Sequence, residues 1–305
     1  MFHVGRSAVR VQLYREFSER MKLPGVAFHT IELASGSEPF AVTDPANPRH
    51  HQIRSDSPIW YKENLVNVAI RKLPADWEYV AWVDADIVFV RPDWPEATLA
   101  KLAQHPIVQM FSQVINLEQD FTVGIVESGF VRNLPKTREA LRMSKQVNLS
   151  GLGQHGFAWA ARRKELEALG GLLDWPIVGN GDRYMAHGLS RFAPPGPPGS
   201  LSPAMHEAYL EWRARAQSVV NYNIGFVDNV IVHYWHGSRA TRGYIERERI
   251  PVEHAFDPKT DLLCDADGLL HLSGNKPALQ EALEQYFAGA PGGRTLADAG
   301  SEQAK

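Results

Sequence analysis

The segment from Glu78 to Phe89, EYVAWVDADIVF, is an apolar run that contains two carboxylates, Asp84 and Asp86, one residue apart. A buried strand does not hold acids unless something offsets the cost of removing their charge from water. Side chains at positions i and i+2 of a strand point to one face, so we expect both carboxylates to converge. Paired carboxylate oxygens suit a hard cation such as Mg²⁺ or Mn²⁺. Alone, an Asp-x-Asp pattern more often marks two solvated acids, so its meaning depends on the rest of the chain.

The segments around residues 78–89 alternate between strand-like and helix-like patterns. This β-α-β-α-β order favours an α/β fold with a mostly parallel sheet flanked by helices. In such sheets the ligand lies beyond the carboxyl ends of the strands, where Asp84 and Asp86 fall. We expect strands over 26–33, 78–89 and 106–115, helices over 11–23, 59–73 and from Asp93 or Pro95 to about 104, and a polar loop over 34–57.

The second half of the chain has weaker patterns. Residues 117–150 predict a long loop, 193–199 a proline-rich loop, and 289–305 a small, polar, disordered tail. The remaining segments predict short strands over 157–160 and 227–235 and helices over 162–169, 205–220, 241–249 and 277–287.

The composition is that of an ordinary soluble globular protein, with 305 residues, 44% hydrophobic and 22% charged. A net charge of -3 lacks the basic excess typical of a dedicated nucleic-acid binder. Cys264 is the only cysteine, which excludes an intramolecular disulfide and fits a reducing compartment. No apolar stretch approaches the ~20 residues of a membrane span, and the first residues do not read as a signal peptide. We therefore expect a cytoplasmic protein.

The predicted helix before the Asp84 strand carries two polar side chains of interest. Lys62 is placed to reach an anionic ligand, and Asn67 lies on a later turn of the same helix. The alternative is a solvated lysine and an asparagine used for packing.

Two glycines frame an aspartate in the segment 179–183, GNGDR. Asp182 opens a predicted helix, where an aspartate is a good N-cap. A carboxylate exposed at such a tip also serves as a general base. Both interpretations remain open from the sequence.

The predicted strand over 227–235 ends in two histidines, followed by basic residues. Imidazole is a common ligand for transition metals such as Mn²⁺, although one histidine alone is more often part of a core. His233 and His236, followed by Arg239 and Arg242, favour a site for a metal and a phosphate. Together with the two aspartates, Lys62 and Asp182, they form the set that sugar transfer from a nucleotide diphosphate requires.

The order of these motifs resembles the GT-A-fold glycosyltransferases, and it is most similar to the β-1,4-galactosyltransferase type. In that family an R-A-K-L-L-N-V-G helix precedes a D-V-D strand, as 62–69 precede 84–86 here. A G-G-x-x-A segment is similar to 156–171, and a W-G-W-G-G-E-D-D-D tip to 178–182. The family's late metal histidine is similar to His236. The H-Y-x-G pattern of retaining lipo-oligosaccharide galactosyltransferases fits 233–237. The resemblance covers roughly residues 1–250.

The resemblance implies a bacterial or phage-like soluble member with one catalytic domain over 1–288 and a tail over 289–305. The nucleotide-binding half would span about 1–116, the acceptor and metal half about 150–250, and a C-terminal helical segment 251–288. The implied reaction is metal-dependent and inverting, with Mn²⁺ or Mg²⁺ and a UDP-sugar donor. The implied residues are Asp182 as base; Asp86, His236, His233 and Asp84 for the metal; Asp84, Ala85, Lys62, Asn67, Arg239 and Arg242 for the nucleotide sugar; and Trp175, Gly181 and His155 for the acceptor.

Two departures from the family pattern matter. The tip holds Gly-Asn-Gly-Asp over 179–182 where the family has several acids. The family also begins with a buried strand ending in P-F-R-N-R, and here Met1 stands where that strand should end. The expected fold is thus a GT-A fold that lacks its usual first strand or replaces it with another segment.

Other functions use the same residues. A nucleotidyltransferase or phosphohydrolase needs similar acids and histidines, and a degenerate sugar-nucleotide binder needs no turnover. The acceptor is open among a glycan, a lipid-linked saccharide, a protein and hydroxymethylpyrimidine DNA. Basic residues that could follow a polyanion are more often solvated helix faces; they are Arg162, Arg163, Lys164, Arg239, Arg242, Arg247 and Arg249. The sequence does not predict the oligomeric state.

Overall fold

A computed structural model describes residues 8–135, 152–191, 201–237 and 244–289. Its helices are α1 (Ala8–Arg20), α2 (Lys62–Arg71), α3 (Trp94–Leu102), α5 (Arg163–Leu169), α6 (Gly181–Leu189), α7 (Pro203–Val220), α8 (Tyr244–Glu253) and α9 (Pro277–Gly289). Its strands are β1 (Thr30–Ala34), β2 (His50–Arg54), β3 (Tyr79–Val83), β4 (Ile87–Phe89), β5 (Ile107–Gln109), β6 (Gln113–Leu117), β7 (Val123–Ser128), β8 (Ala158–Arg162), β9 (Ile224–Phe226), β10 (Val230–His233), β11 (Leu262–Cys264) and β12 (Leu270–Leu272).

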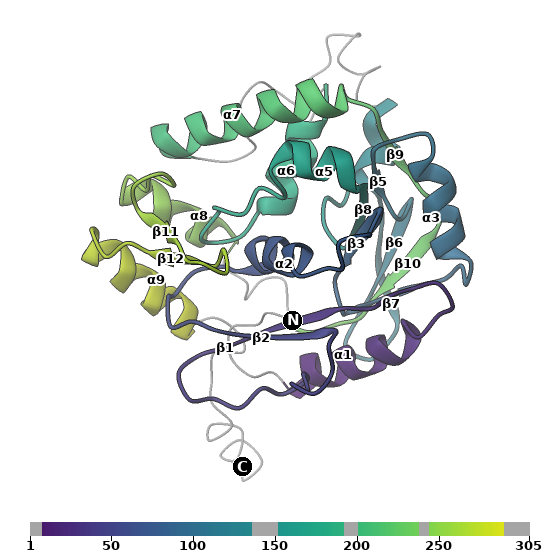
Figure 1. Ribbon diagram of the computed structural model, residues 1–305, viewed down its shortest axis with the longest axis horizontal. Coiled ribbons are helices and arrows are strands. Elements are labelled where there is room, and N and C mark those ends of the chain that lie inside the picture. The colour runs from purple at the N-terminus through teal and green to yellow at the C-terminus, as the bar shows by residue number, and fades with distance from the viewer. Residues whose placement is uncertain (1–7, 136–151, 192–200, 238–243, 290–305) are drawn as a thin grey trace.

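Two four-stranded sheets, in the orders β3-β8-β5-β9 and β4-β10-β6-β7, form the centre of the fold. The prediction of an α/β protein is confirmed, and helices lie around these sheets (Figure 1). The prediction of a mostly parallel sheet is wrong, because only β5/β9 and β10/β6 pair in parallel within them. β8 enters between β3 and β5 antiparallel to both, and β7 follows β6 through a short hairpin. Short connections of that kind join antiparallel strands, whereas parallel neighbours need a long crossover.

The segment 78–89 is not one strand. β3 ends at Val83, β4 begins at Ile87, and the two belong to different sheets. Asp84 and Asp86 therefore lie in the turn between sheets and do not share a strand face. The apolar run predicted continuity because both strands are apolar, but it does not encode which partner each strand pairs with. Residues 106–115 divide in the same way into β5 and β6.

Two predicted loops contain further strands. Residues 34–57 include β2, which pairs in parallel with β1 in a separate two-stranded sheet. The β2 sequence HHQIR has little apolar signal, so pairing with β1 rather than its own pattern defines it. Residues 117–150 include β7, and the chain turns helical again over 130–135. The described chain begins with α1, while residues 1–7, the proline-rich loop 193–199 and the tail beyond Gly289 lie outside the described residues.

Three buried apolar clusters hold these elements together. One packs α5, α6 and α7 against the sheet that contains β8, around Trp159. A second joins α2, α8 and α9 around Leu65. The third covers the inner strands with α1 and α3 around Phe111. Trp159 and Phe111 are large aromatic side chains, and such side chains contribute much of the burial energy of a core. No helix in the described part of the chain is long and apolar enough to cross a membrane.

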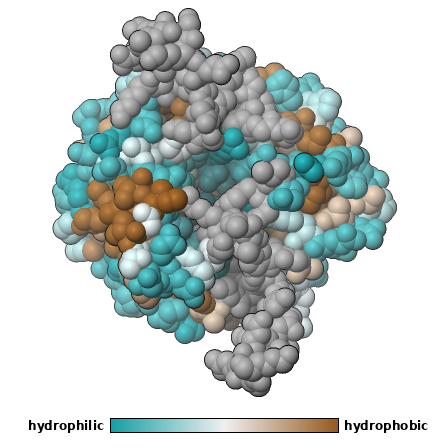
Figure 2. Space-filling view, turned by 180° about the vertical axis from the view of Figure 1, so that it is seen from behind, coloured by the Kyte–Doolittle hydropathy of each residue, from teal (hydrophilic) through white to brown (hydrophobic). Residues whose placement is uncertain are grey.

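The β6–β7 hairpin exposes large apolar side chains. Figure 1 places β6 and β7 at the right of the molecule. In Figure 2, which is turned by 180°, this side is at the left and carries an apolar patch. The exposed side chains of this hairpin are Phe121, Val123, Ile125 and Val126. Because β7 is the outer strand of its sheet, these side chains flank an edge of the fold.

Candidate functional site

The first cluster consists of Asp86, His233 and His236, whose ligand atoms all lie within 4.8 Å of one another. β10 ends at His233, which pairs with Ile87 at the start of β4, so the turn that carries Asp86 is placed beside both histidines. The Nε2 atoms of His236 and His233 lie 3.2 Å and 3.9 Å from Asp86 Oδ2. The strand register thus brings together groups that are about 150 positions apart in the sequence.

This cluster fits a divalent cation. Asp86 Oδ1 is buried and has no hydrogen-bond partner among the described residues. A buried carboxylate oxygen without a partner is costly, and a cation would remove that cost. One carboxylate and two imidazoles suit Mn²⁺ and related metals better than Mg²⁺, which prefers oxygen ligands alone. Asp84 was predicted as a further ligand, but the structure does not bring it into this cluster.

His236 is held by a second contact that bears on cation binding. Its Nδ1 lies 3.3 Å from Arg10 Nη2. A guanidinium only donates hydrogen bonds, so this contact places the proton of neutral His236 on Nε2, facing Asp86. Ligation of a cation through Nε2 requires the proton to move to Nδ1 and the Arg10 contact to open.

The second cluster surrounds the ammonium of Lys62, at the start of α2. Its Nζ lies 2.7 Å from Asp84 Oδ1 and 3.9 Å from Asp182 Oδ2. Burial alone would lower the pKa of Lys62, but the charges of Asp84, Asp182 and Glu63 outweigh it and raise that pKa. Lys62 is therefore firmly cationic and links the Asp84–Asp86 turn to the first turn of α6.

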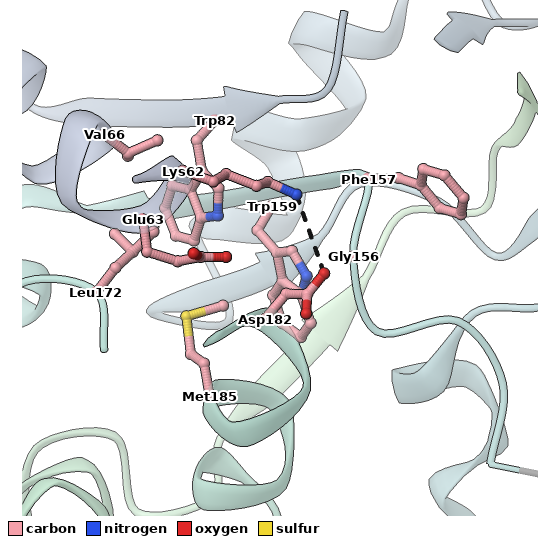
Figure 3. A pocket seen from close by; sticks show the side chains of 10 residues that line it. All are labelled: Lys62, Glu63, Val66, Trp82, Gly156, Phe157, Trp159, Leu172, Asp182 and Met185. Carbon is pink, nitrogen blue, oxygen red and sulfur yellow. Dashed lines mark ion pairs between the residues drawn. The ribbon is translucent and has the colours of Figure 1, made fainter. Parts of the chain in front are cut away.

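Asp182 is not the N-cap of α6. The cap position is Asn180, whose backbone is left-handed with φ 72° and whose side chain makes no capping bond. Asp182 instead accepts a hydrogen bond from the backbone N–H of Arg183 and turns toward Lys62 (Figure 3). Its side chain is 33% exposed, so a substrate group can reach it.

Glu63 is a buried acid at this site that the sequence analysis did not identify. Its residue is only 6% exposed, and its carboxyl points into the same cavity as Asp182 (Figure 3). Burial raises the pKa of Glu63 to about 7, and the nearby Asp182 charge adds to this rise while Lys62 opposes it. Gly181 leaves it room, because a Cβ there would lie 2.7 Å from the Glu63 Cδ. The feature of the sequence that could have identified Glu63 is an acidic residue among the core-facing positions of a predicted helix.

The cavity between these groups is small. Its volume is about 10 Å³, which is room for roughly one water. Its lining combines the charged side chains of Lys62, Glu63 and Asp182 with apolar walls that include Trp82 and Trp159 (Figure 3). The cavity therefore presents a few charged groups among apolar side chains, and it is too small for a whole sugar.

The other predicted residues fall in different places. His155 lies next to Gly156, which abuts the Asp182 carboxylate, and its Nε2 lies 3.1 Å from that of the fully buried His187. Burial lowers the pKa of His155 to about 4 and of His187 to about 3, so both are neutral at pH 7. Gly181 packs on Glu63, and Trp175 stacks on Tyr184 in the core rather than lining the cavity.

Asn67 is not brought to the site. It is buried, donates to the Leu172 carbonyl and to Asp174, and accepts from the Leu172 N–H. These bonds tie α2 to residues 172–174, which is the packing role considered above. Ala85 lies in the turn between the two aspartates. Arg239 and Arg242 lie outside the described residues.

Glu63→Gln is expected to stabilise the protein at alkaline pH and not at acidic pH. The folded-state pKa of about 7 lies above the ordinary glutamate pKa of 4.5, so between these pH values the folded protein keeps a proton on Glu63 that the unfolded chain has lost. Stability therefore falls as pH rises from about 4.5 to 7, and the variant avoids this loss. We expect a gain of up to about 3 kcal/mol at pH 8 and none at pH 4.5, measured by urea unfolding. The exposed Glu253→Gln is the control; an equal gain at both pH values would contradict the assignment.

Comparison with known proteins finds no matching family model, no similar curated protein and no similar solved structure. The interpretation of the site therefore depends on the two clusters and on the resemblance in motif order.

Proposed function

We propose that this chain is a divalent-cation-dependent glycosyltransferase with a GT-A-type fold, which transfers a sugar from a UDP-sugar to an acceptor hydroxyl with inversion. The supporting observation is that a candidate cation cluster and a Lys62–Asp84–Asp182 cluster lie on either side of one turn, 84–86. A diphosphate needs positive charge, and an acceptor hydroxyl needs a base. The cation cluster would supply the positive charge and Asp182 the base, and the turn 84–86 joins the two clusters.

The proposed reaction is a single displacement. The acceptor oxygen forms a bond to the anomeric carbon of the sugar, and the bond from that carbon to the diphosphate oxygen breaks with its electron pair. The hydroxyl proton passes to the Asp182 carboxylate, which is exposed enough to receive it. A bound Mn²⁺ or Mg²⁺ supplies charge neutralisation for the leaving diphosphate. The cationic Lys62 adds positive charge at Asp84, on the same side of the site.

The size of the cavity limits where the sugar binds. Because it accommodates roughly one water, we place the sugar ring at its mouth, in front of Asp182, with Glu63 behind. Asp182 then lies between the buried acid and the substrates. A glycan and a hydroxymethylpyrimidine in DNA both offer the required acceptor hydroxyl.

The test is a panel of nucleotide sugars with Mn²⁺ or Mg²⁺, with and without chelator. Nucleotide release is measured with and without glycan and hydroxymethylpyrimidine-DNA acceptors. We expect release that needs both the cation and an acceptor. Cation-dependent hydrolysis without an acceptor, or pyrophosphate chemistry, would instead indicate a phosphohydrolase or nucleotidyltransferase. Calorimetric binding without turnover on any acceptor would indicate a non-catalytic binder.

A further inference from the structure

His233 presents its two ring nitrogens to different partners. Nε2 faces Asp86, and Nδ1 lies 3.0 Å from Asn116 Oδ1. The ring is buried and packs against Phe157, with ring centroids 4.8 Å apart. Which nitrogen carries the proton decides whether Nε2 can offer a lone pair, because a neutral imidazole has one donor and one acceptor.

The orientation of the Asn116 amide answers this question. Its Nδ2 donates to the Ile125 carbonyl at 3.0 Å and to Glu127 Oε2 at 3.1 Å. A carbonyl accepts only, so the NH₂ end of the amide must face it, and Oδ1 must face His233. Oδ1 also accepts only, so His233 Nδ1 carries a proton, and in the neutral ring the lone pair is on Nε2.

A β-bulge in the β6–β7 hairpin builds this arrangement. Ile115 pairs with Val126 and Leu117 with Val123, so Asn116 alone stands opposite Gly124 and Ile125. The extra residue leaves the Ile125 carbonyl outside the regular ladder, and the Asn116 side chain bonds to it. A glycine at position 124 fits closely here, because a Cβ would lie 3.2 Å from the Asn116 carbonyl oxygen and 2.3 Å from Glu118 Oε1, at the movable end of that side chain.

Two further contacts complete the support. Asn116 and His233 are direct partners in the parallel β6/β10 ladder, so their side chains lie on the same face. Glu127, which receives the Asn116 amide, also accepts from Gln154 Nε2 at 2.6 Å. The amide is therefore held from three sides by elements that belong to the sheet.

We propose that Asn116, held by the Ile125 carbonyl and Glu127, is a positioning residue that fixes His233 as the Nδ1–H tautomer and directs the Nε2 lone pair at Asp86. The effect of Asn116 on cation binding rests on the proposed function. The assignment of the His233 tautomer is independent of that function. Partners of this kind typically change metal affinity by ~10–100-fold when removed, since they orient the ligand and fix its protonation.

The test reads the tautomer directly. Long-range ¹H–¹⁵N spectra of the ¹⁵N-labelled protein in chelator report which ring nitrogen is protonated, and His233→Gln assigns the signals. We expect the Nδ1–H form in the wild type, its loss in Asn116→Leu, and its retention in Asn116→Asp, which keeps an acceptor facing the ring. Asn116→Ser carries the same expectation as Asn116→Leu if the latter fails to fold. An Nε2–H form in the wild type, or an unchanged spectrum in folded Asn116→Leu, would overturn the proposal.

Mn²⁺ titration of the same proteins separates this proposal from the proposed function. We expect ~10–100-fold weaker binding in Asn116→Leu and unchanged binding in Asn223→Leu, an exposed asparagine on another loop. Equal Mn²⁺ affinity in wild type and Asn116→Leu would overturn the positioning role. A wild type that binds no Mn²⁺ but shows the Asn116-dependent Nδ1–H tautomer would contradict the cation site and uphold the tautomer assignment.

Discussion

Asp86→Asn is expected to abolish tight Mn²⁺ binding and to lower cation-dependent sugar transfer by roughly 10²–10³-fold, by analogy with the loss of other electrostatic contributors. Asp86 supplies the carboxylate of the first cluster, and the Nε2 atoms of His233 and His236 both face its Oδ2. An amide keeps the shape of the side chain but removes the charge that a cation needs. Isothermal titration with Mn²⁺ and a nucleotide-release assay measure the two effects.

The stability of Asp86→Asn distinguishes a cation ligand from a structural residue. Asp86 Oδ1 is buried without a partner among the described residues, so neutralising it should not destabilise the metal-free protein. We expect an unchanged or slightly raised Tm in chelator, and the loss of any rise in Tm that Mn²⁺ gives the wild type. Asp267→Asn is a matched control, because the Asp267 carboxylate is exposed and pairs with a surface lysine, Lys72, in a bridge of 2.8 Å. A large fall in the metal-free Tm of Asp86→Asn would show that the carboxylate serves the fold.

The sequence predicted features that depend on a short segment, such as a helix or a motif. It did not predict features that depend on which strands pair with each other. The amphipathic pattern of 59–73 predicted a helix, and α2 lies within it with Lys62 at its start. The two histidines near 233–236 and the Asp-x-Asp pattern were both visible, and the structure brings Asp86 to both histidines. The split of 78–89 between two sheets was not visible, because strand partners are chosen by the whole fold and not by the segment. That split is what directs Asp84 to Lys62 and Asp86 to the histidines.

Side chains that depend on distant neighbours were missed for the same reason. Glu63 is one position from Lys62, yet its role depends on Gly181 and on a cavity formed by residues far along the chain. Asn116 gains its position from a bulge in a hairpin whose second strand, β7, was predicted as part of a loop. Asn67 shows the reverse error: its position in the helix suggested the site, but its partners at 172–174 place it in the packing between elements.

Asp182→Asn is expected to lower transfer by ~10²–10⁴-fold while leaving Mn²⁺ and UDP binding unchanged. The carboxylate lies at the first turn of α6, away from the cation cluster and 3.9 Å from Lys62 Nζ. Asparagine retains an oxygen that can face Lys62, so the site keeps its shape and loses only the group that accepts the proton. The prediction is a fall in kcat with the KM for the donor little changed.

The matched variant for Asp182→Asn is Lys62→Met, which removes the neighbouring cation and leaves the carboxylate. We expect Lys62→Met to weaken UDP binding, since the variant loses positive charge beside Asp84, whereas Asp182→Asn does not. Opposite patterns in the two variants separate proton transfer from diphosphate binding. If Asp182→Asn transfers sugar at the wild-type rate, Asp182 is not the base, and a retaining reaction, which needs no base opposite the leaving group, becomes the better explanation of the site. Its anomeric product, read by ¹H NMR, would then decide between the two stereochemical outcomes.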